Sequence, residues 1–440
     1  MQSKIEITIP DNNIIERTYI IDVIFHDFLD ISYEIRCSHS VSDYILIFDD
    51  RKIIFRDGFW NRLSRPLEYL DLKNLPNPSF TTNNFIIESN IPILYGSDEL
   101  FFDEKMVICG IDIFASIFFM LTRWEEYVNK TRDQYNRFPA TASTAYQHHF
   151  LHRPIVNEYV EMLWNMLIKM GYVKKRKKRK FELILTHDID MIHYKERFKL
   201  IFGDIIKRKN IVLALKRCTT FWKNPYDTFD FLMTVSEKIG IKSHFYFMAA
   251  KEGLNNKDND FYIYTRAFGK IVESIKERGH IIGFHPGYES YNDLKIWKEQ
   301  KLSLETMLDC SVKEGRQHYL MMNIPETLEY WEDGGMDIDS TLGYADEPGF
   351  RCGTGDVFSY FNFLRQKKMF LHERPLIVMD GTLKVYKKLS LHESINILHY
   401  YSEIGKKYEM PITFLFHNSS FDFFNWNGWM KIYKELVSDH

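Results

Sequence analysis

The stretch FELILTHDID, residues 181–190, places ionisable side chains where an apolar run ends. Its apolar first half predicts a short buried strand, and Thr186 begins the exit from that strand. His187, Asp188 and Asp190 follow at once. An unpaired buried carboxylate is costly, so this cluster must be solvated, paired or bound to a metal. Aspartate is also a favoured helix N-cap. The choice between capping and chemistry therefore depends on the other strand ends of the chain.

The rest of the C-terminal half alternates predicted strands with predicted helices. Such repeated strand–helix units indicate a parallel sheet, either open or closed as a barrel. The expected strands cover 181–187, 241–248, 280–285, 316–321, 375–380 and 412–418, and the expected helices cover 227–239, 268–279, 293–308 and 391–407.

The first 173 residues have a different pattern. Residues 1–100 are rich in strand formers, and the two apolar runs within 44–60 predict a β-hairpin. The Pro- and Asn-rich segment 74–84 is expected to be a loop. Helices are predicted at 112–128, with Asp112 as N-cap, and at 156–170. We therefore expect residues 1–173 to form a smaller mixed α/β accessory domain.

Seven consecutive basic residues, KKRKKRK at 174–180, separate the two patterns. Such a run could contact anionic lipid or nucleic acid, but a solvated linker kept extended by its own charge is the favoured interpretation. We predict a domain boundary here, with 181–440 folding independently as the second domain.

Composition restricts the class of protein. The 440 residues are 45% hydrophobic and carry a formal net charge of −3, which favours globular domains and gives no overall bias toward nucleic acid or membranes. The five cysteines are far apart and form no CxxC pair, which is typical of reduced thiols. The start of the chain lacks the apolar core of a signal peptide, and the apolar run at 108–127 is too short to span a bilayer. A cytoplasmic protein without an integral membrane segment is expected.

Further ionisable side chains follow the other predicted strands. Each alone has an ordinary structural interpretation, such as a turn, a cap or a satisfied core histidine. Together they are expected to meet, because the carboxyl ends of parallel strands form one edge of a sheet. Imidazole and carboxylate ligands suit Zn²⁺ or another divalent first-row ion, which supports hydrolysis. The residues are Asp188, Asp190, His285, Arg316, His318, Asp380 and His417.

The segments LILTHDID, GIKSHFYFM and ERGHIIGFHPGYES, within 181–290, resemble the polysaccharide deacetylases of the NodB-homology, carbohydrate-esterase type. Residues 1–173, with FFMLTRWEEY, are similar to the accessory domain that precedes a variant branch of these proteins. The resemblance implies a deformed (β/α) barrel that removes N- or O-acetyl groups from a glycan with one divalent metal ion, zinc being the first candidate.

The resemblance also implies roles for individual residues. In the family, the first acid of the strand-end pair is the general base and the second binds the metal, which points to Asp188 and Asp190; here Ile189 separates them. His285 matches the first metal histidine, and the position of the second is occupied by Glu289, with His187, His193 and His318 as other candidate ligands. Arg316 matches the arginine that orients the base. His417 matches the late histidine that protonates the leaving group.

Three residues are assigned to the substrate: His318, Arg351 and Asp380. Arg351, in the glycine-rich GFRCGTG at 349–355, is equally compatible with a structural role. The main alternative is a non-catalytic glycan-binding or scaffold protein on a degenerate barrel, and a metal phosphoesterase is the third possibility. The expected partner is an acetylated carbohydrate and not a nucleic acid; the sugar and the oligomeric state are left open.

Overall fold

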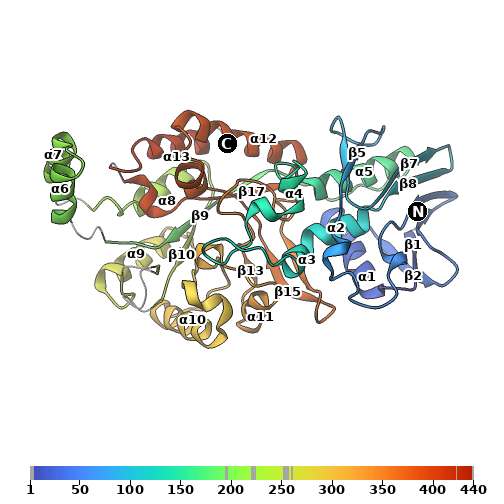
Figure 1. Ribbon diagram of the computed structural model, residues 1–440, viewed down its shortest axis with the longest axis horizontal. Coiled ribbons are helices and arrows are strands. Elements are labelled where there is room, and N and C mark those ends of the chain that lie inside the picture. Colours follow the sequence, from blue (N-terminus) through green and yellow to red (C-terminus); the bar gives the residue numbers. More distant parts are fainter. Residues whose placement is uncertain are drawn as a thin grey trace.

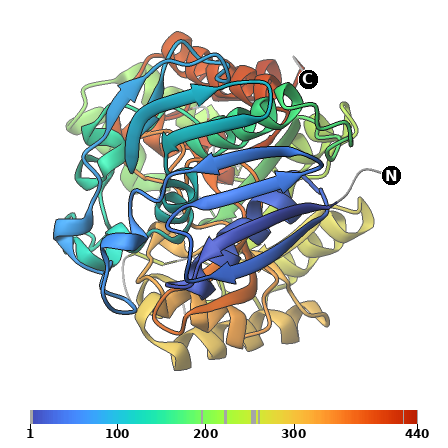
Figure 2. The same ribbon diagram turned by 90° about the vertical axis from the view of Figure 1, so that its right-hand side faces the viewer.

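The computed structural model describes residues 4–193, 197–219, 224–250, 257–258, 261–422 and 424–438. Two large β-sheets organise these residues, and each sheet is built from one side of the basic run 174–180. The six-stranded sheet faces the viewer in Figure 2, and the nine-stranded sheet occupies the centre of Figure 1.

The N-terminal sheet is mixed, with strand order β2-β1-β3-β4-β8-β7. The predicted hairpin at 44–60 is confirmed, because β3 and β4 pair antiparallel. The segment predicted as a loop at 74–84 contains a short strand, β5, which pairs with β6. The strands are β1 (Ile5–Pro10), β2 (Tyr33–Ser38), β3 (Tyr44–Phe48), β4 (Arg51–Phe55), β5 (Ser79–Thr81), β6 (Ile91–Ile93), β7 (Gly96–Phe102) and β8 (Met106–Ile111).

Helices pack against this sheet. The single helix expected at 112–128 is interrupted at Arg123, whose φ of 53° is left-handed, so that two helices form. Asp112 caps the first of them as predicted, accepting a hydrogen bond from the amide of Ala115 at 2.9 Å. The helices of this part are α1 (Ile14–Asp22), α2 (Ile113–Thr122), α3 (Trp124–Val128), α4 (Thr144–Gln147) and α5 (Ile155–Lys169).

The C-terminal sheet is curled and predominantly parallel, in the order β14-β15-β13-β12-β11-β10-β9-β17-β16. Its pairings are parallel except for β14 with β15, and within the described chain its two end strands are not paired with each other. The strands are β9 (Glu182–Ile189), β10 (His244–Phe247), β11 (Ile281–Phe284), β12 (Glu314–Gly315), β13 (Ile338–Asp339), β14 (Phe358–Asn362), β15 (Lys367–Glu373), β16 (Leu376–Met379) and β17 (Pro411–Leu415).

Most helices of this half run along the outside of the curled sheet (Figure 1). The helices predicted at 227–239, 268–279, 293–308 and 391–407 are confirmed as α8, α9, α10 and α12. The strand predicted at 316–321 is wrong, because the strand ends at Gly315 and a short 3₁₀ turn follows. The helices are α6 (Arg197–Ile206), α7 (Ile211–Thr219), α8 (Phe229–Glu237), α9 (Arg266–Glu277), α10 (Leu294–Leu308), α11 (Glu326–Asp333), α12 (Leu391–Tyr408) and α13 (Trp429–Ser438).

The two halves share one hydrophobic core. Buried apolar side chains from Ile5 to Val437 form a continuous cluster. The ring of Tyr19 stacks on that of Phe361 at 4.7 Å between centroids, and the hydroxyl of Tyr360 donates to the carbonyl of Thr122 at 2.6 Å. This continuity contradicts our expectation that 181–440 folds independently, because a single hydrophobic core crosses the boundary at 174–180.

The basic run is extended but is not a freely solvated linker. Arg176 pairs with Glu161 at 2.5 Å and covers Trp164, while Arg179 pairs with Asp356. Both arginines are half-buried, and the lysines between them are exposed. The two arginines therefore bind the protein, while Lys177 and Lys178 between them face solvent. The boundary at 174–180 remains a prediction.

Candidate metal centre

Strand ends of the curled sheet bring several of the candidate residues to one place. Asp188 is the second-last residue of β9, Asp190 directly follows the strand, His285 follows β11, and Arg316 and His318 follow β12. Asp380 follows β16, and His417 lies two residues beyond β17. A cavity of about 340 Å³ is lined by Asp188, Asp190, His318 and His417 together.

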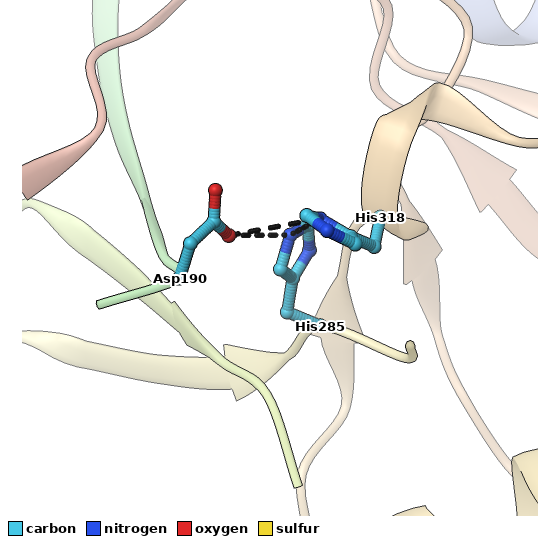
Figure 3. Close-up of side chains that lie close together, drawn as sticks. All are labelled: Asp190, His285 and His318. Carbon is cyan, nitrogen blue, oxygen red and sulfur yellow. Dashed lines mark hydrogen bonds and ion pairs between the residues drawn. The ribbon is translucent and has the colours of Figure 1, made fainter. Parts of the chain in front are cut away.

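Asp190, His285 and His318 form the closest group (Figure 3). One ligand atom from each lies within 4.8 Å of the others. The Oδ1 atom of Asp190 is 3.3 Å from Nε2 of His285 and 3.6 Å from Nδ1 of His318. The two ring nitrogens are 3.0 Å apart.

The hydrogen bonds of the two rings fix which nitrogens face the centre. Nδ1 of His285 donates to the carbonyl of Arg316 at 2.6 Å, and Nε2 of His318 donates to the carbonyl of Lys257 at 2.7 Å. In a neutral imidazole, the nitrogen opposite the donating one carries a lone pair. When both rings are neutral, as metal binding requires, their two lone pairs face each other beside Asp190. Histidine ligands of metals have this arrangement, with the outer N–H held by a carbonyl or carboxylate.

The residues present therefore fit a divalent cation. Oδ1 of Asp190 is buried and accepts no hydrogen bond among the described residues, which is costly unless a cation satisfies it. Two imidazoles and one carboxylate with an open side are a common catalytic zinc set.

Asp188 is held beside this centre by Arg316. The Nη1 atom of Arg316 donates to Oδ1 of Asp188 at 2.8 Å and to the hydroxyl of Thr186 at 2.9 Å. The rest of the guanidinium donates to the carbonyl and hydroxyl of Ser340, and the arginine is fully buried. The second oxygen of Asp188, Oδ2, lies 3.8 Å from Nε2 of His285. Arg316 thus fixes one carboxylate oxygen of Asp188, and the other oxygen faces the candidate metal centre.

His417 lies across the cavity and is fixed by Asp380. The Nδ1 atom of His417 is 2.8 Å from Oδ1 of Asp380, and its backbone amide donates to Oδ2 at 2.7 Å. Its Nε2 atom lies 3.7 Å from Oδ2 of Asp190. Burial disfavours the charged ring, but the carboxylates, Asp380 first, outweigh burial and raise the pKa of His417 to about 10. A proton donor is therefore held facing the cavity.

Other candidates do not reach the centre. Glu289, expected as a metal ligand, is exposed and lies outside the group, because the turn after β11 directs it outward; His318 occupies the third position instead. His187 points to the opposite face of β9, where burial lowers its pKa to about 4 and its Nδ1 donates to the carbonyl of Phe416 at 2.8 Å. His193 lines a different cavity.

The expected substrate contacts are also revised. Arg351 is buried against Glu126 of α3, with its Nε 2.9 Å from Oε1, and its Nη1 donates to the carbonyl of Gly343. The arginine therefore joins the two halves and does not line the cavity. Asp380 is inaccessible, since its side chain is fully buried under His417. It positions the histidine and cannot touch a substrate.

One cavity residue comes from the N-terminal half and was not predicted. Arg137 lines the cavity, donating to the carbonyl of Tyr319 at 3.2 Å and to the hydroxyl of Tyr386 at 3.0 Å. Its segment also contacts the rim through Tyr135, whose carbonyl accepts from the hydroxyl of Tyr288 at 2.9 Å. Nothing in the local sequence around Arg137 indicates that it lies beside residues nearly two hundred positions away.

A comparison with protein-family models matches the N-terminal half of the chain. A family model described as a family of unknown function (DUF7033) matches residues 5–172. No curated protein matches the chain. Among the described helices, none has both the length and the apolar composition needed to cross a membrane.

Solved structures similar to the chain are distant. A protein of Mycobacterium smegmatis assigned as a polysaccharide deacetylase has 13% identity and a TM-score of 0.39, covering 61% of this chain and 86% of its own. A polysaccharide deacetylase of Bacillus cereus has 11% identity and a TM-score of 0.31, with 59% and 86% covered. A mutant of a CE4-family pseudoenzyme with restored activity has 10% identity and a TM-score of 0.29, with 60% and 64% covered. At these TM-scores the function has to be argued from the site.

Proposed function

We propose that the chain is a metal-dependent deacetylase that hydrolyses N- or O-acetyl groups of a glycan, and that its curled sheet is a deformed (β/α) barrel of the polysaccharide-deacetylase type. The observation that carries the proposal is the pair of ring nitrogens of His285 and His318, 3.0 Å apart with their lone pairs facing, beside the unsatisfied Oδ1 of Asp190. A divalent ion, zinc first, satisfies all three atoms.

The proposed base, Asp188, and the proposed acid, His417, lie on either side of this centre. A divalent ion bound by Asp190, His285 and His318 would lower the pKa of a bound water and polarise the acetyl carbonyl. Asp188 then accepts the proton of the attacking water through its free oxygen, while Arg316 keeps the carboxylate in place. Asp190 keeps its carboxylate for the ion and takes no proton.

His417 completes the reaction from the other side. Its Nε2 faces the cavity, and Asp380 fixes the ring through Nδ1 and through the backbone amide. The histidine donates a proton to the departing amine as the carbon–nitrogen bond to the acetyl group breaks, or to the departing alkoxide as the carbon–oxygen bond breaks. An acid and a base on opposite sides of one cavity are what acyl hydrolysis needs.

A carbohydrate substrate is supported by the sequence resemblance and by the residues that line the cavity. A cavity of about 340 Å³ is large enough to hold one sugar unit. Tyr319 and Tyr386 line it together with Arg137, which offers ring faces and hydrogen-bond donors to a polar ligand.

The test combines metal analysis with acetate release by the purified full-length chain. The acetyl probes are chitin oligosaccharides for N-acetyl groups and acetylated xylan for O-acetyl groups, with p-nitrophenyl phosphate as the phosphoesterase probe. Asp190→Asn is compared with Asp337→Asn, the same chemical change at an exposed aspartate that precedes β13. We expect bound metal, acetate release that a chelator abolishes, and loss of both only in Asp190→Asn.

The other outcomes contradict the proposal in distinguishable ways. Bound metal with phosphate release and no acetate release would make the protein a metal phosphoesterase. A folded chain with neither bound metal nor turnover would make it a non-catalytic protein on a degenerate barrel.

A further inference from the structure

A helical hairpin with an exposed apolar surface follows the candidate metal centre along the chain. It consists of α6 and α7 and lies at the end of the molecule opposite the N-terminal sheet (Figure 1). The sequence analysis predicted neither helix, because no regular strand–helix unit contains them. The proposed deacetylase chemistry uses no residue of this hairpin.

The hairpin is an ordered unit. The amide of Asn210 donates to the carbonyl of Asp204 at 2.8 Å, which closes the turn between the helices, and the Asn210 side chain caps α7 through the amide of Leu213. Ala214 is buried between the helices, and the carboxylate of Asp204 is buried and paired with Arg208. The outward face is therefore a fixed surface.

Both helices of the hairpin expose large apolar side chains. Large apolar side chains are normally buried, and a cluster of exposed ones marks a binding surface. The exposed fractions here reach 78% at Val212 and 68% at Ile206. The cluster, which we call the hairpin face, consists of Phe202, Ile205, Ile206, Ile211, Val212 and Leu215.

The charge of the same segment is strongly positive, although the whole chain carries −3. Its only acid is Asp204, which is already paired with Arg208. Basic residues beside an apolar helical face are typical of segments that lie on a membrane surface. The basic residues of 197–219 are Arg197, Lys199, Lys207, Arg208, Lys209, Lys216 and Arg217.

We propose that the hairpin face docks on an anionic lipid bilayer. The ten residues of α6 extend only about 15 Å, half the thickness of the hydrocarbon layer, so the hairpin lies in the interface and does not span it. The apolar side chains enter the acyl boundary, and the exposed Lys207 and Lys209 contact the anionic headgroups. A protein partner with a neutral groove would leave this positive charge without a counterpart.

The experiment is flotation of the full-length chain with phosphatidylcholine vesicles, with and without phosphatidylglycerol. We expect binding only with the anionic lipid, and loss of binding at high salt because screening weakens the charge term. The double variant Phe202→Asp/Val212→Asp should bind at least about tenfold more weakly, since each apolar side chain loses its transfer into lipid. The matched control is Phe370→Asp/Val173→Asp, the same residue types at sites that are 81% and 77% exposed.

A second pair of variants tests the charge. Lys207→Gln/Lys209→Gln should weaken binding, whereas Lys175→Gln/Lys178→Gln, in the basic run 174–180, should not. Circular dichroism confirms that each variant retains its helices. The proposal is overturned if the wild-type chain binds neither vesicle, if it binds both equally, or if the variants in the basic run lose binding instead. It is also overturned if the wild-type chain forms a dimer without lipid that Phe202→Asp/Val212→Asp abolishes, which would assign the hairpin face to a second copy.

Discussion

Asp188 and Asp190 are two residues apart, and side chains of a strand alternate, so both point to the same face of β9. Their partners nevertheless differ. Arg316 donates to Asp188, whereas Asp190 faces His285 and His318 and keeps one oxygen without a hydrogen bond. The surroundings therefore assign a proton-accepting role to the first acid and a ligand role to the second.

This division predicts different defects for the two amide variants. Asp190→Asn should lose most of the bound metal and all activity, because a neutral amide is a poorer ligand than a carboxylate. Asp188→Asn should keep the metal and lose about 10²–10⁴-fold in turnover, because an amide cannot accept the proton. Metal analysis beside acetate release measures both. Equal metal loss in the two variants would show that both acids are ligands.

His318 and Glu289 provide a second residue-scale prediction, since the family pattern points to the glutamate and the structure to the histidine. His318→Ala should lower metal affinity by at least about 100-fold, because removing a direct ligand costs no less than removing an outer-shell partner. Glu289→Ala should leave affinity unchanged, because the side chain is exposed. Competition with a calibrated zinc chelator compares the variants. A larger effect of Glu289→Ala would restore the glutamate as the ligand.

Arg137 tests whether the N-terminal half takes part in binding. The arginine lines the cavity but contacts none of Asp188, Asp190 and His417. Arg137→Ala should therefore raise KM for the acetylated probe and leave kcat within a few-fold, the pattern of lost ground-state binding. The control is Arg132→Ala in the same segment, whose guanidinium binds the backbone carbonyls of Glu126 and Asn129. Equal effects of both variants would indicate only a loosened segment.

At the scale of elements, the regular strand–helix units were more predictable than the segments between them. Apolar runs followed by polar residues gave β9, β11, β16 and β17 and the strand ends where the metal centre forms. Strand ends are predictable because hydrophobic patterning is a local regularity of the sequence. Arg316 was among the predicted site residues, although the strand before it, β12, is only two residues long.

The missed parts depend on contacts between distant segments. The third ligand position was assigned to Glu289 from the family resemblance, but the short 3₁₀ turn after Arg316 carries His318 to the centre. Asp380 and Arg351 were assigned to substrate because their partners, His417 and Glu126, were not identifiable from neighbouring residues. Sequence spacing identifies which strand end carries a group, and packing determines what the group touches.

Inside the curled sheet, Glu314 of β12 connects three strands. Its carboxylate is 2.5 Å from Nδ1 of His244 on β10 and 3.2 Å from Nη2 of Arg374, which follows β15. Burial opposes ionisation, but His244 and Arg374 outweigh burial and lower the pKa of Glu314 to about 2. A carboxyl whose pKa is lower in the folded state stabilises the fold above its unfolded pKa.

Glu314→Gln should therefore lower the free energy of unfolding at pH 7 by on the order of 2–3 kcal/mol. The difference from the wild-type chain should shrink as pH falls from about 4.5 toward 2, because the wild-type carboxylate is then protonated in the folded state too. Urea unfolding at several pH values measures it. Glu104→Gln, at an exposed site in the turn between β7 and β8, is the control. A difference that does not change with pH would show that the carboxylate charge is not the cause.

At the scale of the whole molecule, a buried charge network joins the halves. Glu126 of α3 binds Arg123 at 2.9 Å on its own side and Arg351 of the C-terminal half on the other. Arg123 also donates to the hydroxyl of Tyr344 at 3.1 Å. These groups are almost fully buried, so each charge relies on its partners. The segment RWEE, at 123–126, therefore holds the two sheets together.

This network predicts cooperative unfolding of both halves. Glu126→Ala leaves two buried arginines short of a partner and should cost about 3–5 kcal/mol. Hydrogen exchange followed by mass spectrometry should show loss of protection in β1–β8 and β9–β17 together, because one core connects them. Glu99→Ala, which removes an exposed ion pair with Arg56 on the N-terminal sheet, should change little. If Glu126→Ala exposed the amides of only one sheet, the halves would unfold separately, and the independent barrel expected from the basic run would be restored.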